Sequence, residues 1–113
     1  MRGPTGAKYL EGGSRIEIPA KLTKAQSKKI HEYAVRAYQS IDCTGMARAD
    51  FFLEKNSGRI FVNELNTIPG FTSISMYPKM WEHSGLPMPK LVDRLIELAL
   101  DRHAAKQRLR YSK

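Results

Sequence analysis

Two carboxylates and an amide near the middle of the chain have the chemistry of a site for a hard metal ion. Asp50 lies in an alternating run, Met46–Phe52, and Glu64 and Asn66 lie in a second run that starts at Ile60. The oxygen atoms of these side chains suit Mg²⁺, whereas zinc favours His or Cys. Mg²⁺ needs few protein ligands, since it commonly binds through one or two carboxylates together with substrate phosphates. The residue types therefore indicate a magnesium site, and the alternative is an exposed strand face with ordinary carboxylates.

The segment between the two runs predicts that they form an antiparallel hairpin. Residues 54–58 include Asn, Ser and Gly, which favour a chain reversal. With the turn centred on Ser57, Asp50 lies opposite Glu64, and like charges in that position destabilise a sheet unless something neutralises them. A bound cation is the natural candidate. Strict alternation predicts one shared face for each strand, made by Met46, Arg48, Asp50 and Phe52 in the first and by Ile60, Val62, Glu64 and Asn66 in the second.

A short strand and a helix are predicted before the hairpin. Residues 15–19 alternate between polar and apolar types, as a short strand does. Thr23 is a good N-cap for the helix, and Gln26, three residues on, completes a capping-box pattern. The helix should end in the Asp42–Gly45 segment. It should bury Ile30, Ala34, Ala37, Tyr38 and Ile41 and expose Lys24, Lys28, Lys29 and Arg36.

A loop and two helices are predicted after the hairpin. Residues 67–77 show no period and contain a Pro-Gly pair, so they form a long loop directly after the acidic strand, where functional residues are common. Gly70 fits either a simple turn or a close approach of the backbone to a ligand. Pro78 opens a short helix that ends near Ser84. The last helix leads beyond Arg102 into a basic tail, and the end of this tail should fray. This helix carries a broad apolar stripe, made by Leu91, Val92, Leu95, Ile96, Leu98 and Ala99.

The composition limits the classes of protein to which the chain can belong. Its 113 residues suffice for one modest domain or for part of a larger one. It carries 19 Lys and Arg against 11 Asp and Glu, and the net charge of +8 suggests phosphate-bearing partners such as nucleic acid, a nucleotide or an anionic membrane. The single cysteine, Cys43, excludes an internal disulfide and suits a reducing cytosol. Because no apolar run reaches the roughly 18 residues of a membrane helix and no signal peptide is visible, a cytoplasmic protein is expected.

Residues 63–72, Asn-Glu-Leu-Asn-Thr-Ile-Pro-Gly-Phe-Thr, closely resemble a signature of bacterial D-alanine–D-alanine ligases. Ser75–Pro78 extend the resemblance, residues 45–50 resemble an upstream motif of that family, and Ala7–Leu10 resemble its mobile active-site loop. The resemblance implies an α+β fold, the C-terminal part of an ATP-grasp domain with an antiparallel sheet flanked by helices. It also implies the reaction. ATP activates D-alanine as an acyl phosphate, a second D-alanine attacks it, and a tetrahedral intermediate collapses to D-alanyl-D-alanine for peptidoglycan synthesis.

The resemblance gives roles to the residues of the hairpin and the loop. Asp50, Glu64 and Asn66 would hold two Mg²⁺ ions, or Mn²⁺, against the phosphates of ATP. Arg48 would act as a catalytic residue that faces the transferred phosphoryl group. The Gly70 N–H would stabilise the oxyanion of the intermediate, a role that is commonly a large part of catalysis. These assignments agree with the magnesium chemistry that the oxygen ligands indicate on their own.

Four further residues would bind the substrates. Ser75, which also belongs to the catalytic set, and the Met76 backbone would hold the carboxylate of the second D-alanine. Lys8 would contact the γ-phosphate of ATP, and Tyr9 would help to close the loop over the site. Tyr9 and Met76 favour D-alanine as the second substrate over the D-lactate or D-serine of related vancomycin-resistance ligases. The expected partners are therefore small molecules, with no nucleic acid and no membrane.

The chain departs from the family in length. Residues 1–6 do not match the segment that precedes the loop, residues 104–113 form a basic tail, and family members are much longer and commonly homodimeric. We therefore expect residues 1–113 to be the C-terminal part of an ATP-grasp ligase that carries the metal and second-substrate subsites and is inactive alone. Two alternatives stay open. One is another ATP-grasp carboxylate–amine ligase with a different acceptor, and the other is a basic nucleic-acid-binding module that uses the +8 charge.

Overall fold

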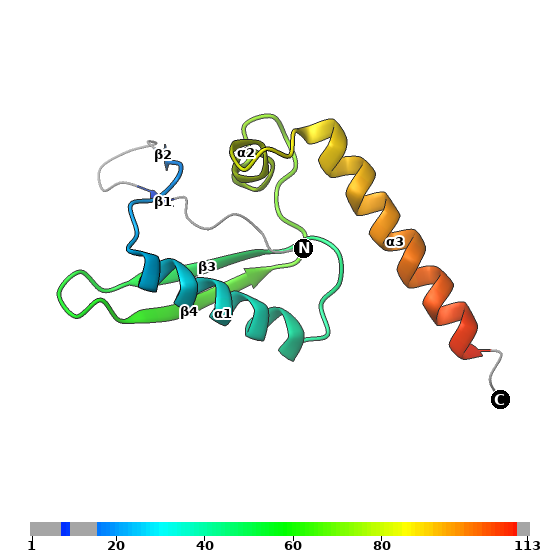
Figure 1. Ribbon diagram of the computed structural model, residues 1–113, viewed down its shortest axis with the longest axis horizontal. Helices are drawn as coiled ribbons and strands as arrows, with labels where there is room; N and C mark the ends of the chain where they lie inside the picture. Colours follow the sequence, from blue (N-terminus) through cyan, green and yellow to red (C-terminus); the bar gives the residue numbers. More distant parts are fainter. Residues whose placement is uncertain (1–7, 10–15, 111–113) are drawn as a thin grey trace.

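Apart from a short strand at residues 8–9, the strands and helices follow one another in the order that the sequence predicts (Figure 1). The computed structural model describes residues 8–9 and 16–110, and predictions for residues 1–7, 10–15 and 111–113 lie outside this part. The antiparallel strands flanked by helices confirm the predicted α+β class. The elements are β1 (Lys8–Tyr9), β2 (Ile16–Glu17), α1 (Lys24–Ser40), β3 (Arg48–Leu53), β4 (Ile60–Asn66), α2 (Met76–His83) and α3 (Met88–Arg110).

The two N-terminal strands are short. β2 covers only part of the strand predicted over residues 15–19. It pairs antiparallel with β1, so that Lys8 lies opposite Glu17 and Tyr9 opposite Ile16. Lys8 and Tyr9, expected within a loop, therefore lie in a strand.

α1 begins at the predicted N-cap. The Thr23 hydroxyl accepts a hydrogen bond from the Gln26 N–H at 3.1 Å, and Gln26 Oε1 accepts one from the Thr23 N–H at 3.0 Å, which completes the predicted capping box. The Lys and Arg side chains predicted to be outside are exposed. The prediction that Ile41 lies on the buried face is wrong. Ile41 is the C-cap and is exposed because the chain leaves the helix there, with Asp42 at a φ of 50°.

β3 and β4 form the predicted antiparallel hairpin, and Asp50 lies directly opposite Glu64. Beyond this pair the register shifts by one residue, so that Phe51 lies opposite Val62 instead of Asn63. An extra residue in one strand turns all the residues beyond it onto the other face of the sheet. Side chains in both halves of β4 alternate between the two faces of the sheet, but the alternation of residues 60–62 is opposite to that of residues 64–66.

The register shift corrects the predicted faces of the sheet. The prediction that Ile60 and Val62 share a face with Glu64 is wrong, since the shift moves them to the opposite face. Phe61, opposite Phe52, takes their place beside Glu64, and both phenylalanines are exposed. The face that carries these two phenylalanines is called the acidic face, and its other residues are Arg48, Asp50, Glu64 and Asn66. α1 packs along β4 on the other face, where Ile60 is half-buried (Figure 1).

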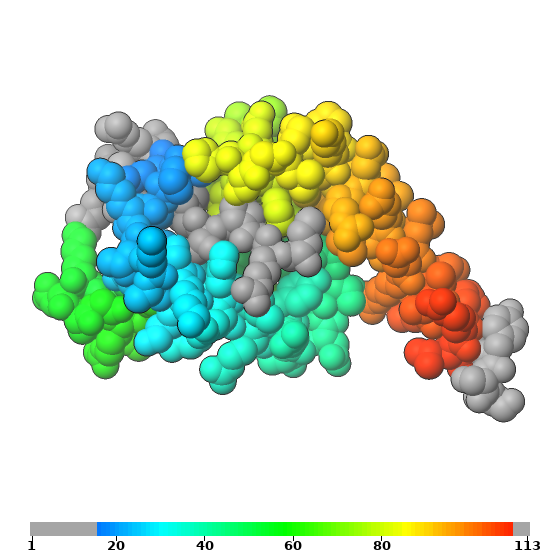
Figure 2. Space-filling model, in the orientation of Figure 1, coloured from blue at the N-terminus to red at the C-terminus, as the bar shows by residue number. Residues whose placement is uncertain are grey.

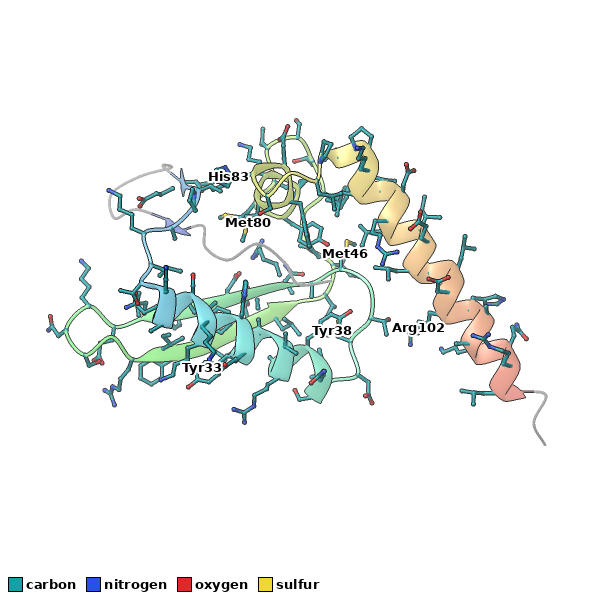
Figure 3. The ribbon with its side chains drawn as sticks, in the orientation of Figure 1. Tyr33, Tyr38, Met46, Met80, His83 and Arg102 are labelled. Atoms are coloured by element: carbon teal, nitrogen blue, oxygen red, sulfur yellow. The ribbon has the colours of Figure 1, made fainter. Side chains whose placement is uncertain are left out.

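The buried core lies between α2 and α3. Tyr77, Trp81 and Leu91 form its centre, and the rings of Tyr77 and Trp81 meet edge-on with their centroids 6.4 Å apart. Four partly buried side chains pack around them, namely Met46, Phe71, Leu86 and Leu95. Met46 comes from the segment just before β3, so it joins the hairpin to the two helices (Figure 3). α2 begins at Met76, earlier than predicted, because the buried side of its first turn already belongs to this core.

α3 is a long helix with much of its surface exposed. It continues to Arg110, so most of the predicted basic tail is helical, and the end of the tail, which is predicted to fray, lies outside the described residues. Within the predicted apolar stripe Leu91 is fully buried, whereas Val92 and Ile96 are exposed. The stripe is only partly covered because only the start of α3 packs against α2. The helix then passes the segment that joins α1 to β3, where Arg102 reaches Thr44, and its last turns project from the body (Figures 1 and 2). None of the described helices is long and apolar enough to cross a membrane.

Candidate functional site

Arg48 links the two acidic residues of the hairpin. Its Nε and Nη2 atoms donate to Oδ1 and Oδ2 of Asp50, each at 2.9 Å, and Nη2 lies 3.9 Å from Oε1 of Glu64. The contact forms because alternate residues of a strand share a face and Glu64 lies opposite Asp50. The repulsion expected between the two carboxylates is therefore offset by a two-pronged arginine contact. Alternation in the sequence places Arg48 beside these carboxylates, but it does not reveal this contact.

Asn66 lies at the same end of the acidic face, opposite Arg48. Its Oδ1 accepts a hydrogen bond from the Ile68 N–H at 3.1 Å, which is an Asx turn at the start of the loop after β4. An amide oxygen has two lone pairs, so this bond leaves it able to bind a cation. The structure therefore gathers the three predicted metal ligands at one end of one face.

The donor set fits a hard cation. Asp50 and Glu64 supply carboxylate oxygens, and those that accept from Arg48 keep further lone pairs. In the described part of the chain, no group of three or more His, Cys, Asp or Glu side chains is arranged to hold a metal ion. An ion on the acidic face would therefore depend on water or ligand phosphates for the rest of its coordination, which is the usual situation of Mg²⁺.

Gly70 and Ser75 touch across the loop that joins β4 to α2. A Cβ atom on Gly70 would lie 3.0 Å from Oγ and 3.5 Å from Cβ of Ser75, so a larger residue at position 70 would have to displace the Ser75 side chain slightly. The serine is itself held in place, because its Oγ accepts from the Thr72 N–H at 3.0 Å and lies 2.7 Å from Thr72 Oγ1. The predicted loop is therefore compact. Thr72, which the sequence did not mark as functional, fixes the catalytic serine candidate.

Ser75 is also the N-cap residue of α2, but its side chain makes no capping hydrogen bond. The hydroxyl turns back toward Thr72 and Gly70 instead. The amino end of a helix carries partial positive charge, which favours a carboxylate nearby. Met76 and Tyr77, the first residues of α2, are buried, and burial raises the pKa of the Tyr77 hydroxyl above its ordinary value. The start of α2 is thus anchored in the core beside the Gly70–Ser75 contact.

Lys8 and Tyr9 are described only as strand residues. β1 pairs with β2, which leads into the segment before α1. Their predicted contacts with ATP stay predictions.

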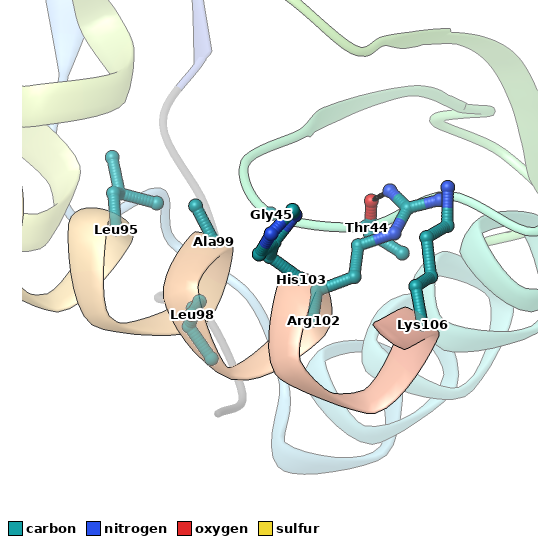
Figure 4. A pocket seen from close by; sticks show the side chains of 8 residues that line it. All are labelled: Thr44, Gly45, Leu95, Leu98, Ala99, Arg102, His103 and Lys106. Atoms are coloured by element: carbon teal, nitrogen blue, oxygen red, sulfur yellow. Dashed lines mark hydrogen bonds between the residues drawn. The ribbon is translucent and has the colours of Figure 1, made fainter. Parts of the chain in front are cut away.

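A separate crevice lies between α3 and the segment that joins α1 to β3 (Figure 4). Arg102 donates a hydrogen bond to the Thr44 hydroxyl across it, and Tyr38 donates one to the Gly45 carbonyl oxygen at 2.9 Å (Figure 3). Its lining residues are Thr44, Gly45, Leu95, Leu98, Ala99, Arg102, His103 and Lys106. None of these belongs to the predicted catalytic or metal-binding set. The crevice is therefore distinct from the acidic face.

The sequence matches one family of known proteins along most of its length. The family model described as D-ala D-ala ligase C-terminus matches residues 5–97. The D-alanine–D-alanine ligase of Solibacter usitatus (strain Ellin6076) is 55% identical over 106 residues, which cover 94% of this chain and 33% of that protein.

Solved structures lead to the same family. The D-alanine–D-alanine ligase from Coxiella burnetii matches with a TM-score of 0.80 and 53% identity, over 84% of this chain and 27% of that one. The VanG D-Ala:D-Ser ligase from Enterococcus faecalis matches with a TM-score of 0.68 and 41% identity, over 80% of this chain and 27% of that one. This chain therefore spans a third or less of the length of these relatives. These matches confirm the resemblance and the ATP-grasp fold, and the chain belongs to the D-alanine–D-alanine ligase family as a counterpart of its C-terminal part.

Proposed function

We propose that this chain is the metal-binding and acceptor-binding part of an ATP-dependent ligase that joins two D-alanines for peptidoglycan synthesis. The observation that supports this most strongly is the acidic face, where Arg48 contacts Asp50 and lies near Glu64, followed directly by the loop in which Gly70 touches Ser75. The identities of 55% and 53% to D-alanine–D-alanine ligases support the choice of substrate. Because the chain spans a third or less of such ligases, we expect it to be inactive alone.

The acidic face would bind the phosphates of ATP through divalent metal. Asp50, Glu64 and Asn66 would hold two ions, Mg²⁺ or Mn²⁺, since all three supply oxygen atoms at one end of this face. Such ions, when bound, stabilise the negative charge that develops during phosphoryl transfer. Arg48 adds a fixed positive charge at the same place, held by its two bonds to Asp50, and it would face the transferred phosphoryl group. Lys8 would contact the γ-phosphate, and Tyr9 would help to cover the site.

The loop before α2 would hold the second D-alanine. The Gly70 N–H would donate to the oxyanion of the tetrahedral intermediate, and the absence of a Cβ lets the reacting group come close. Ser75 Oγ and the Met76 N–H would bind the carboxylate at the amino end of α2, where the helix dipole favours negative charge. The hydroxyl suits this role because it is turned toward the loop instead of capping the helix.

A second candidate is a ligase that uses another acceptor. The observation in its favour is the 41% identity to a D-Ala:D-Ser ligase. D-Serine adds a hydroxyl to the acceptor, and D-lactate would replace the attacking amine with a hydroxyl. Met76 and Tyr9 favour D-alanine by their resemblance to the dipeptide-forming members. We place the complete enzyme in the cytoplasm as a homodimer, because ATP is a cytosolic substrate and this family commonly dimerises.

The test compares the isolated chain with a completed ligase. In the completed ligase, this chain replaces the matched part of the Coxiella burnetii enzyme, which is 27% of that chain. Phosphate release from ATP is measured for both proteins with D-alanine, D-serine or D-lactate as the acceptor. We expect D-alanine-dependent release from the chimera and none above background from the isolated chain.

The possible results separate the two claims. Robust turnover by the isolated chain would show that it is not incomplete. A folded chimera that uses D-serine or D-lactate in preference to D-alanine would support the second candidate. A folded chimera that releases phosphate with none of the three would rule out the proposed role.

A further inference from the structure

The Ser75 hydroxyl bonds to the loop before α2 and not to α2 itself. A serine at the N-cap position usually accepts a hydrogen bond from the N–H of the second or third residue of its helix. The third residue of α2 is Pro78, which has no N–H, and the Ser75 side chain makes no capping hydrogen bond. The sequence of α2 therefore removes one of the usual partners of this hydroxyl, and the structure pairs the hydroxyl with Thr72 instead.

Thr72 and Ser75 are joined through their backbones as well as their side chains. The Ser75 N–H donates to the Thr72 carbonyl oxygen at 3.0 Å, which closes a β-turn. The Thr72 N–H donates to Ser75 Oγ at 3.0 Å, and the two hydroxyl oxygens lie 2.7 Å apart. The backbone groups therefore hold the two residues together. The Thr72 side chain contributes the contact between the hydroxyls, in which either oxygen can be the donor.

The hydrogen-bonding capacity of Ser75 Oγ fixes the direction of this contact once a carboxylate is bound. A hydroxyl has one proton to donate and two lone pairs that accept. One lone pair of Ser75 Oγ already accepts from the Thr72 N–H. A carboxylate only accepts hydrogen bonds, so it takes the proton of the Ser75 hydroxyl. The remaining lone pair of Ser75 Oγ then accepts, and Thr72 is the donor across the 2.7 Å contact.

We propose that Thr72 is a positioning residue for the acceptor substrate. Its hydroxyl donates to Ser75 Oγ, so that the Ser75 hydroxyl directs its own proton at the carboxylate of the second D-alanine. Hydrogen bonds in such a chain polarise one another, which strengthens the Ser75 donor as well as orienting it. Thr72 acts through Ser75 and does not itself contact the substrate. This inference rests on the proposed function, because it concerns the same acceptor site.

The test removes the Thr72 hydroxyl and keeps its N–H. In the Coxiella burnetii chimera described above, Thr72→Val should raise the KM for the acceptor about fivefold, the usual size of one net hydrogen bond, and should change kcat little. Thr72→Ser keeps a hydroxyl and should stay within about twofold of the wild type. Ser73→Ala removes a hydroxyl from the same turn and is the matched control. Because D-alanine fills both substrate positions, the rate is fitted with a constant for each position, and only the acceptor constant should rise.

Combination with Ser75→Ala separates positioning from direct contact. If Thr72 acts through Ser75, Thr72→Val should add little to the acceptor KM of the Ser75→Ala chimera. A rise of the same size in both backgrounds would show that Thr72 contacts the substrate itself, and it would overturn the proposal. Failure of Thr72→Ser to recover the wild-type KM would overturn it as well, because the hydroxyl would then not be the group that matters.

Urea unfolding of the isolated chain tests the contact between the hydroxyls without any enzyme activity. Thr72→Val should lower the unfolding midpoint of the wild-type chain and should lower it less in the Ser75→Ala background. Equal shifts in both backgrounds would show that the contact is absent and would overturn the proposal. An active chimera whose acceptor KM is unaffected by Thr72→Val would refute this inference and leave the proposed function standing. A folded wild-type chimera without D-alanine-dependent phosphate release would contradict the proposed function, and the inference would fall with it.

Discussion

Both carboxylate oxygens of Asp50 are held by Arg48, each at 2.9 Å, and the same guanidinium lies 3.9 Å from the Glu64 carboxylate on the facing strand. The sequence suggests that a metal ion neutralises these two carboxylates. In the structure Arg48 supplies positive charge at the same place. Any cation that binds on the acidic face has to share the carboxylates with Arg48. The stability of the hairpin and its affinity for metal should consequently be linked.

Arg48→Met should make the stability of the chain depend on magnesium. The change leaves Asp50 opposite Glu64 without a guanidinium, and we expect a loss of about 1 kcal/mol in the free energy of unfolding. Millimolar MgCl₂ should restore more of that loss in the variant than it adds to the wild type. Urea unfolding with and without MgCl₂ measures both effects. Arg94→Met is the control, because Arg94 pairs with Glu97 on the exposed side of α3, and an equal magnesium response in both variants would contradict the linkage.

Glu64→Gln in the chimeric ligase should reduce metal-dependent turnover by about 100-fold and spare the fold. The amide keeps the shape of the side chain but removes the charge that holds a divalent ion. Glu32→Gln is a close control, since its side chain is 57% exposed against 59% for Glu64 and its carboxylate lies 4.0 Å from Lys28. Turnover is measured across a range of Mg²⁺ concentrations. A near-normal rate for Glu64→Gln at ordinary Mg²⁺ would remove Glu64 from the ligand set.

Gly70→Ala should disturb the loop through Ser75. The new Cβ would lie 3.0 Å from Ser75 Oγ, which Thr72 holds in place, so we expect a loss of about 1–2 kcal/mol in stability and a higher KM for the acceptor in the chimera. The double variant with Ser75→Ala should lose less stability than the sum of the single changes, because the clashing oxygen is gone. Strict additivity in urea unfolding would show that the clash is not the cause.

Thr23→Ala should destabilise the chain by about 1 kcal/mol, because it removes the hydroxyl that accepts from the Gln26 N–H. Thr23→Ser keeps this acceptor and should cost much less. The helical signal during urea unfolding reports the effect. If both variants lose equal stability, the methyl group of Thr23 and not its hydroxyl supports α1.

The free energy of unfolding should fall at alkaline pH because of Tyr77. Burial raises the pKa of its hydroxyl above the ordinary value of 10.0, so the folded state favours the neutral form. The stabilisation is complete below pH 10 and is lost as the pH rises through the raised folded value. Burial also raises the pKa of Tyr38, so Tyr77→Phe should reduce the alkaline slope without abolishing it. Urea unfolding on both sides of pH 10 measures the slope, and an unchanged slope in Tyr77→Phe would refute the assignment.

Local features of the fold could be predicted because the residues that decide them are neighbours in sequence. The capping box needs only Thr23 and Gln26, and the hairpin turn needs only residues 54–58. The predicted pairing of Asp50 with Glu64 is present, but it needs the extra residue in β4, because the register next to the turn would place Asp50 opposite Asn63. Ile41 was misplaced because helical periodicity does not show where the chain turns away from the helix.

Features that depend on a partner elsewhere in the protein could not be predicted in this way. Nothing in the sequence around Asn63 distinguishes it as the position of the register shift, which depends on how both halves of β4 pack. Periodicity identifies the apolar stripe on α3 but not how much of it is covered, because it counts apolar residues and not the surfaces available to cover them. The Arg48–Asp50 contact depends on the side-chain conformation of Arg48, and a strand allows several such conformations.

The extra residue in β4 changes how this segment should be compared between proteins. Because of it, Ile60 and Val62 lie on one face of the sheet and Glu64 lies on the opposite face of the same strand. Deleting Asn63 would give β4 a single alternation along its whole length. Either Ile60 and Val62 or Glu64 would then lie on the wrong face of the sheet. An insertion or deletion at this position would therefore be far more damaging than most substitutions, and alignments of the family should treat it as a fixed length.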